Sequence, residues 1–146
     1  MQLSMTGEYA LRAMLFICSS PFGATFQISE IAEKNDIPEN FLRKIIPLLK
    51  KGNILNSQRG NGGGISLMKK AEYITPLEII EIVEGPIALN KCLISDKFCS
   101  RDGYCSFHAL WSETQQQLKK MLSDINMLKL AEKNTENYMK FNIVLN

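Results

Sequence analysis

The pattern of hydrophobic and polar positions predicts three helices in the first third of the chain. Apolar residues recur every three or four positions over Leu11–Cys18, which is the spacing of a buried helical face. We expect this first helix to cover about residues 6–20, with Cys18 as a thiol of the core. A short helix over 29–35 and a third helix over 38–51 follow, separated by a tight turn.

The third helix is strongly amphipathic, and its proline is unusual. An internal proline removes a backbone hydrogen bond at a cost of about 3 kcal/mol, so Pro47 predicts a kink or a restart of the helix. The inner face is expected to hold Phe41, Leu42, Ile45, Ile46, Leu48 and Leu49, and the outer face Asn40, Arg43, Lys44, Pro47 and Lys51. Two short helices joined by a tight turn, the second with a basic outer face, are typical of a helix-turn-helix.

A β-hairpin is predicted directly after the third helix. Residues 54–59 and 65–68 have the composition of strands, and the glycine-rich segment 60–64 joins them. No Gly-Lys-Ser/Thr follows these glycines, and the next element is a strand, so the segment is not a nucleotide-binding P-loop. The hairpin is therefore interpreted as a wing, and the fold class as mainly α with a small β wing.

The second half begins with a strong helix start and ends with a long amphipathic helix. Thr75, Pro76 and Glu78 occupy the N-cap, first and third positions of a helix that is expected to end near Glu84. After a cysteine-rich loop, apolar residues continue at helical spacing over about 107–125, a helix too long to be covered by its own small domain. We expect it to pack against a second copy, forming a homodimer; packing within one chain is the alternative.

These elements divide the chain into three parts. We expect a winged helix-turn-helix domain over residues 1–74. Residues 75–133 are expected to hold a linker helix, the cysteine-rich loop 92–108 and the dimerisation helix. Residues 134–146 are expected to form a frayed or weakly docked tail.

Composition and charge narrow the class of protein. The chain has 146 residues, of which 45% are hydrophobic and 22% charged, as in ordinary globular proteins. No apolar run approaches the roughly 18–20 residues of a membrane span, so we expect a cytoplasmic protein without membrane contact. The net charge of +2 is unevenly placed, because residues 43–70 contain seven basic residues and no acidic one. A basic stretch within a helix-turn-helix and wing indicates nucleic-acid binding.

The cysteine-rich loop carries the chemistry of a metal site. Cys92, Cys99, Cys105 and His108 have the spacing Cys-x6-Cys-x5-Cys-x2-His, and they include three of the four cysteines and the single histidine. In a reducing compartment, closely spaced cysteines are more often metal ligands or redox thiols than disulfides. Thiolate and imidazole donors suit an iron-sulfur cluster or a structural zinc ion. Zinc sites usually bring two ligands within two to four residues, which favours the cluster.

Three segments carry a resemblance to a known family. They are the opening MQLSMTGEYALRAM, the wing RGNGGG followed by Ile65-Ser66-Leu67, and CSFHALW over Cys105–Trp111. Up to about Lys133 the chain resembles the bacterial winged-helix iron-sulfur transcription regulators of the IscR/NsrR/RirA family. The resemblance implies a homodimeric regulator of transcription. It also implies that Cys92, Cys99 and Cys105 hold an iron-sulfur cluster. The residues themselves give no sign of catalysis, because the chain has a single histidine and no paired carboxylates or nucleophile with an obvious base, so we expect neither an enzyme nor a small-molecule substrate.

The fourth ligand of that cluster has two candidates. The segment around His108 is similar to IscR, which implies a 2Fe-2S cluster with the histidine as ligand. Relatives similar to NsrR carry a carboxylate near the position of Glu8, which reaches a 4Fe-4S cluster across the dimer. The gap from Cys92 to Cys99 is one residue longer here than in IscR. The 2Fe-2S cluster is favoured, a 4Fe-4S cluster is possible, and His108 and Glu8 both remain candidates.

The resemblance and the basic stretch together predict the partner and the signal. The partner is double-stranded operator DNA, contacted through Asn40, Arg43, Lys44, Lys51, Arg59 and Asn61. Loss, oxidation or nitrosylation of the cluster is expected to relax the loop and change the spacing of the two recognition helices. Two alternatives remain open, namely a DNA-binding regulator with a structural Cys3His zinc site, and a cluster carrier that binds no DNA.

Overall fold

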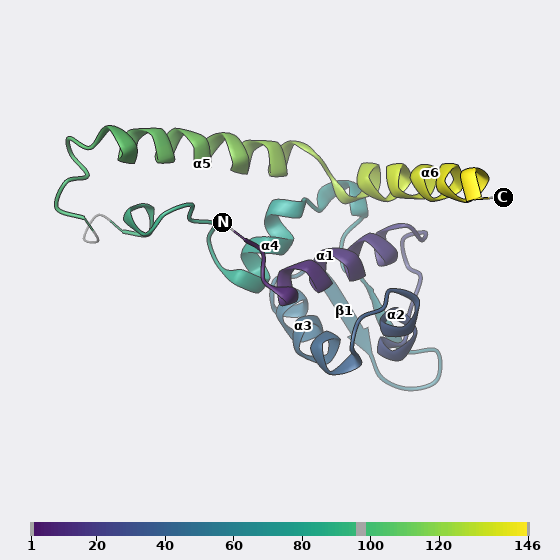
Figure 1. Cartoon of the computed structure of the whole chain (residues 1–146). Helices are drawn as coiled ribbons and strands as arrows, with labels where there is room; N and C mark the ends of the chain where they lie inside the picture. Colours follow the sequence, from purple (N-terminus) through teal and green to yellow (C-terminus); the bar gives the residue numbers. More distant parts are fainter. Residues whose placement is uncertain (1, 96–98, 146) are drawn as a thin grey trace.

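The computed structural model describes residues 2–95 and 99–145 and shows a helical body with a projecting hairpin (Figure 1). Its helices are α1 (Met5–Cys18), α2 (Ile28–Lys34), α3 (Glu39–Lys51), α4 (Pro76–Glu84), α5 (Ser106–Asp124) and α6 (Met127–Leu145). The strands β1 (Leu55–Gln58) and β2 (Gly64–Leu67) form the hairpin, and two short 3-10 turns are η1 (Ala71–Tyr73) and η2 (Lys91–Leu93). This architecture confirms the predicted winged helix-turn-helix followed by a long helix.

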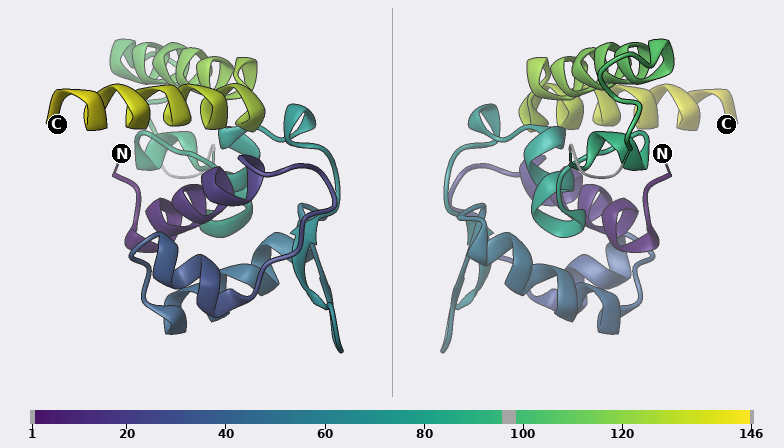
Figure 2. Two further views of the ribbon diagram at one scale, coloured as in Figure 1. Left: turned by 90° about the vertical axis from the view of Figure 1, so that its right-hand side faces the viewer. Right: turned by 90° about the vertical axis from the view of Figure 1, so that its left-hand side faces the viewer.

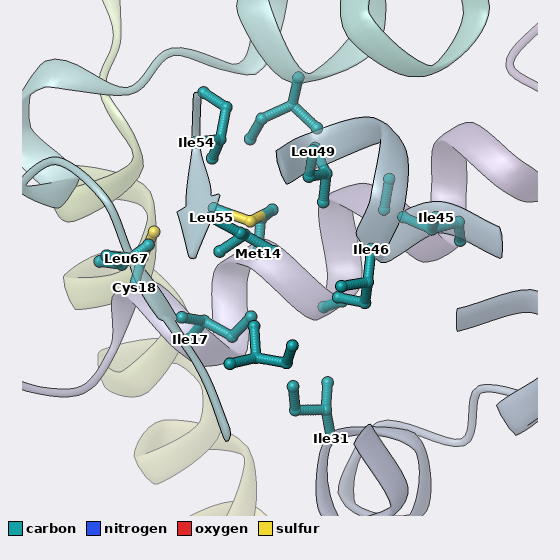
Figure 3. Packing of buried hydrophobic residues seen from close by; sticks show 14 of the residues in the cluster. Met14, Ile17, Cys18, Ile31, Ile45, Ile46, Leu49, Ile54, Leu55 and Leu67 are labelled. Atoms are coloured by element: carbon teal, nitrogen blue, oxygen red, sulfur yellow. The ribbon is translucent and has the colours of Figure 1, made fainter. Parts of the chain in front are cut away.

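The core lies between α1, α3, α4 and the base of the hairpin. α1 begins after Ser4, whose hydroxyl oxygen accepts a hydrogen bond from the Gly7 amide at 3.3 Å. Its inner face is fully buried, and it packs against apolar side chains of α3 and β1 (Figure 3). The residues of this contact include Met14, Ile17, Cys18, Ile45, Ile46, Leu49, Ile54 and Leu55. α3 and the base of the hairpin are therefore anchored to one continuous apolar core.

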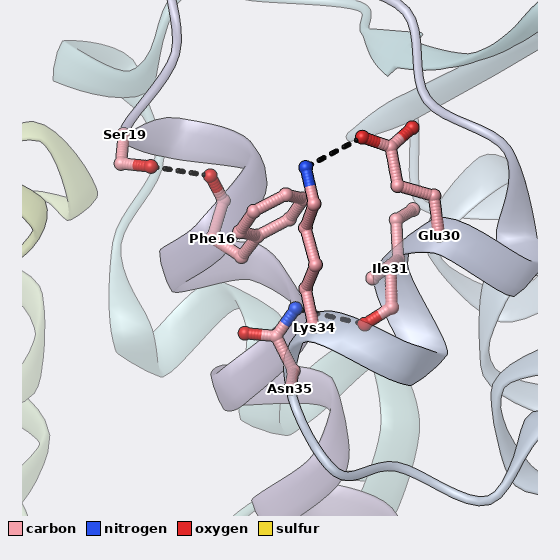
Figure 4. Close-up of polar contacts among 6 residues, drawn as sticks. All are labelled: Phe16, Ser19, Glu30, Ile31, Lys34 and Asn35. Atoms are coloured by element: carbon pink, nitrogen blue, oxygen red, sulfur yellow. Dashed lines mark hydrogen bonds and ion pairs between the residues drawn. The ribbon is translucent and has the colours of Figure 1, made fainter.

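α2 contacts α1 through the side chain of Lys34, and polar contacts within α2 hold this lysine and the end of the helix in place (Figure 4). The Lys34 ammonium lies 2.8 Å from the Glu30 carboxylate and 5.5 Å from the centre of the Phe16 ring. The Asn35 side chain donates to the Ile31 carbonyl at 2.8 Å, which satisfies a carbonyl in the last turn of α2. These contacts fix the short helix that precedes the turn into α3.

α3 is a single helix, and its apolar stripe is narrower than predicted. The helix continues through Pro47 from Glu39 to Lys51 and does not restart, and the proline ring is exposed. Leu48 was predicted on the inner face but is 37% exposed, whereas Leu49 is fully buried. The structure thus corrects the prediction for Leu48, which lies at the edge of the stripe that α1, α4 and β1 cover.

The hairpin is antiparallel and is anchored at its base. β1 pairs with β2 in the register Leu55 to Leu67 through Gln58 to Gly64. β1 is thus one residue shorter at each end than predicted, and β2 has the predicted length but begins and ends one residue earlier. Ile65 also pairs with Phe26 through two backbone hydrogen bonds of 2.9 and 2.7 Å. The tip of the hairpin extends past the helices on the side of α2 and α3, away from α5 and α6 (Figure 2). This is the geometry of a wing.

The C-terminal half consists of α4, the cysteine loop and two long helices. The Thr75 hydroxyl oxygen accepts a hydrogen bond from the Glu78 amide at 3.2 Å, as predicted for this helix start. No residue of α5, all of which the structure describes, is fully buried. α6 is anchored by Met127 and Ala131, which join the core.

Residues 134–145, predicted as a frayed or weakly docked tail, are helical, because α6 continues through them to Leu145. Their side chains, as far as the structure describes them, are almost all exposed. In the described part of the chain, no helix is both long and apolar enough to span a membrane.

Candidate DNA-binding surface and cysteine loop

The outer face of α3 presents the predicted polar residues to solvent. Asn40, Arg43, Lys44 and Lys51 are all exposed, as the amphipathic pattern required. Arg43 is held by a carboxylate one turn earlier, because its Nε and Nη2 atoms lie 3.0 and 2.5 Å from the Glu39 Oε1 atom. Arg43 must therefore leave Glu39, or share it, before its guanidinium can contact a phosphate or a base.

The tip of the wing carries the other two predicted residues. Arg59 and Asn61 are exposed, and they flank Gly60, which has a φ of 102°. A left-handed φ is accessible mainly to glycine, so the sequence permits this tight tip. The Gln27 side chain donates a hydrogen bond of 2.7 Å to the carbonyl of Gly63, which joins the wing loop to the start of α2. Arg59 is thus presented on a supported loop.

The basic residues of the 43–70 stretch divide into paired and free groups. Lys69 lies 2.6 Å from Glu78, and the Lys50 ammonium donates to the Ser57 hydroxyl. In residues 2–95 and 99–145, Lys44, Lys51 and Arg59 form no ion pair. These three cations are exposed on α3 and the wing, where they are available to an anionic partner.

The described parts of the cysteine loop, residues 92–95 and 99–105, project beyond the helical body, and the second of them leads into α5 (Figure 1). Cys92 lies in η2, Cys99 in the loop, and Cys105 at the N-cap of α5, and each is half-buried. All four cysteines of the chain are free thiols. Among the described residues, no three cysteine, histidine or acidic side chains meet as a metal-binding group.

The two candidates for the fourth ligand lie in different settings. His108 is in the first turn of α5, three residues after Cys105, and is half-buried. Within the described chain its Nδ1 atom is buried without a hydrogen-bond partner. Glu8 is exposed in the first turn of α1. His108 is three residues from Cys105 in sequence, and thiolate and imidazole donors are the kinds that suit an iron-sulfur cluster or zinc.

The fourth cysteine is chemically different from those of the loop. Cys18 is buried in the core, as predicted, and burial raises the pKa of its thiol to about 12. It therefore stays a neutral thiol at physiological pH, and the thiolate is the form that binds metals. The loop cysteines are the metal-ligand candidates of this chain.

The profile of the Rrf2 family, described as an iron-dependent transcriptional regulator, matches residues 3–133 of the chain. The chain belongs to the Rrf2 family. The matched segment includes α1, α3, the wing, the cysteine loop and α5. The protein is accordingly a helix-turn-helix transcriptional regulator, and members of this family are not enzymes.

Relatives of this Rrf2 protein share most of its length. A protein of Haemophilus influenzae named as an HTH-type transcriptional regulator is 30% identical over 133 residues, which cover 91% of this chain and 88% of the relative. A protein of Azotobacter vinelandii with a similar name is 28% identical and covers 90% and 79% of the two chains. Both similarities extend across the DNA-binding domain and the long helix.

Two solved structures share the fold of this Rrf2 protein. CymR, the global cysteine regulator of Bacillus subtilis, superimposes with a TM-score of 0.77 at 23% identity, covering 91% of this chain and 98% of its own. IscR of T. potens superimposes with a TM-score of 0.75 at 22% identity, covering 94% and 90%. At this identity the likeness establishes the fold.

One contact in this Rrf2 protein was missed by the sequence reasoning. Glu39 and Arg43 are four residues apart in α3, a spacing at which opposite charges pair on a helix. That spacing was visible in the sequence and could have identified the pair. Glu39 is therefore part of the candidate DNA-binding surface, because it controls when Arg43 is free.

Proposed function

We propose that this Rrf2 protein binds operator DNA as a homodimer and that an iron-sulfur cluster held by Cys92, Cys99 and Cys105 controls this binding. The observation that carries the proposal is one chain that combines a supported basic wing with three free, half-buried thiols at the entrance to α5. The recognition surface lies on α3 and the wing. The cysteine loop precedes the N-terminal end of the long helix α5 (Figure 1).

The DNA-binding half of the proposal is supported by the unpaired cations. Lys44 and Lys51 on α3 would lie along the major groove or its phosphates, with Asn40 and Arg43 beside them. Arg59 and Asn61 at the wing would reach the adjacent minor groove or backbone. The exposed face of α3 and the tip of the wing point to the same side of the molecule, which permits simultaneous contact (Figure 2).

An Arg59→Ala variant is expected to bind operator DNA about tenfold more weakly, because it loses one charge-assisted contact worth about 1.5 kcal/mol. The slope of log K against log salt concentration should fall by about 0.9, since one fewer phosphate is neutralised. Fluorescence anisotropy at several salt concentrations measures both quantities. The DNA is a sequence selected from a random pool by the wild-type protein.

The control for this experiment is Lys140→Ala, which removes one positive charge from the exposed surface of α6, far from the wing. Its affinity and salt slope should stay close to those of the wild type. If Arg59→Ala keeps the wild-type affinity and slope, Arg59 does not contact DNA.

The cluster half of the proposal is supported by the donor set. The three loop thiols are free and half-buried, so a metal ion can reach them, whereas Cys18 is buried in the core, where burial raises the pKa of its thiol to about 12. Metal binding is coupled to the ordering of its ligands, so the loop is expected to close when the donors are engaged. When bound, the cluster supplies a redox-sensitive group that iron supply, oxidation or nitric oxide can remove or alter.

The buried, unpartnered Nδ1 atom supports His108 over Glu8 as the fourth ligand. A His108→Ala variant is therefore expected to shift the visible absorption spectrum and to lose the cluster several-fold faster in the presence of a chelator. Glu8→Ala should leave both properties unchanged. A spectrum that changes in Glu8→Ala and not in His108→Ala would instead assign the fourth place to the carboxylate.

The dimer is supported by the apolar side of α5. Phe107, Leu110, Trp111 and Met121 lie along one side of this helix, and Phe107 and Met121 are 67% and 73% exposed. Beside the end of α5, an open and mostly apolar groove of about 560 Å³ lies between α1 and α6. A second copy that packs its α5 across this surface would cover both features. Cluster loss would then alter the placement of α5 and the spacing of the two recognition helices.

A further inference from the structure

The two ends of the cysteine loop are joined by a hydrogen bond. The backbone amide of Leu89 donates to the Oε1 atom of Gln115 at 3.0 Å, in a partly buried position. Leu89 lies three residues before Cys92, and Gln115 lies seven residues, or about two helical turns, after His108. This single contact therefore closes a loop that contains all four candidate donors of the cysteine loop.

Gln115 also lies on the face of α5 that faces its own protomer. His108, Gln115 and Lys119 are half-buried and lie within about 40° of one another around the helix axis at 100° per residue. The exposed apolar residues Phe107 and Met121 lie on the adjacent face. The contact made by Gln115 thus sets the direction in which His108 points, because both side chains share one rigid helix.

A second contact on the same face prevents α5 from turning. The Lys119 ammonium lies 2.7 Å from the Glu81 carboxylate of α4, and both side chains are about one-third exposed. α5 also packs against η2, the turn that carries Cys92. With two polar anchors one turn apart, both the rotation of α5 and its distance from the Cys92 side of the loop are defined.

We propose that Gln115 is a positioning residue of the cysteine site, which holds Cys105 and His108 at a fixed separation from Cys92. This inference rests on the proposed function, because it needs the loop to bind a metal. A glutamine suits the role, since its amide oxygen accepts from a main-chain N–H without placing a charge beside anionic thiolates. Support of this kind for metal ligands commonly affects metal affinity.

The test measures cobalt(II) binding to the full-length apo protein under anaerobic conditions, through the thiolate-to-cobalt absorption band. Gln115→Leu removes the acceptor and is expected to weaken cobalt binding about five- to tenfold. Gln115→Glu keeps an acceptor oxygen but adds a negative charge, so it should weaken cobalt binding less than Gln115→Leu does. The matched control is Gln116→Leu, the same change one residue later, at an exposed position about 100° further around α5.

A further variant protects the test against a packing artefact. Gln115→Ala removes the acceptor without adding an apolar side chain, so it must show the same loss as Gln115→Leu. Circular dichroism of each variant checks that α5 is retained.

Two outcomes separate this inference from the proposed function. If the wild type binds cobalt through the loop and both Gln115→Leu and Gln115→Ala match it, the positioning role is overturned while the metal site stands. If the wild type binds neither cobalt nor a reconstituted cluster, the proposed cluster site itself is overturned, and the role of Gln115 falls with it.

Discussion

If the loop holds the proposed iron-sulfur cluster, a Cys105→Ser variant is expected to bind no cluster and to be colourless after anaerobic reconstitution. Cys105 is the N-cap residue of α5 and precedes His108 by one turn, so it is the thiol that joins the loop to the long helix. Serine is similar in size but is a hard and very weakly acidic donor, unlike the soft thiolate that clusters require. Absorption spectra with iron, sulfide and zinc assays measure the result.

The matched control is Cys18→Ala, which removes the other kind of cysteine in the chain. Burial raises the pKa of the Cys18 thiol to about 12, so this residue does not supply a thiolate and its replacement should leave the cluster in place. If the Cys105→Ser protein keeps the iron and sulfide content of the wild type, Cys105 is not a ligand of the site. If the wild-type protein carries zinc and no sulfide, the loop is a structural zinc site and not a cluster site.

Replacing Leu49 by alanine should destabilise the protein by about 2–5 kcal/mol, the usual cost of a cavity at a fully buried leucine. Leu49 is 0% exposed and packs in the core on the buried side of α3 (Figure 3). The neighbouring Leu48 is 37% exposed, so Leu48→Ala should cost less than about 1 kcal/mol. Urea unfolding of the apo protein, followed by circular dichroism, measures both free energies.

The comparison of the Leu48 and Leu49 variants tests which face of α3 is buried. The two variants make the same chemical change one residue apart, so helix propensity and composition cancel in the comparison. Equal losses of stability would mean that α3 is rotated from the orientation described above. The outer face with Lys44 and Lys51 would then be misassigned as well.

Local patterns predicted most of the DNA-binding domain. The periodicity of α1 and α3, the turn before α3 and the glycine-rich hairpin all appear where expected, because each depends on residues close in sequence. Leu48 was misplaced, since helical periodicity defines a direction but does not say how wide a strip the neighbouring elements cover. That width depends on β1, which follows α3 directly, and on α1 and α4, which come from distant parts of the chain.

The end of the chain was predicted as a tail for a related reason. The segment 134–146 contains polar residues and no clear apolar stripe, so it gave no local sign of a stable helix. In the structure, α6 starts with the Met127 amide bonded to the Ile74 carbonyl at 2.8 Å, and Ala131 is buried in the core. Tertiary contacts thus form the costly first turns, and the helix then extends at little further cost.

The sequence by itself determined the winged helix, the exposed polar face of α3 and the spacing of the cysteines and histidine in the loop. Its residue types and spacings are sufficient for those, because they reflect local backbone preferences and side-chain chemistry. The tertiary structure alone decided which cations are free, and it joined Leu89 to Gln115 and Glu81 to Lys119. These contacts link residues 26 and 38 positions apart, and only the packing of α5 beside α4 brings such groups together.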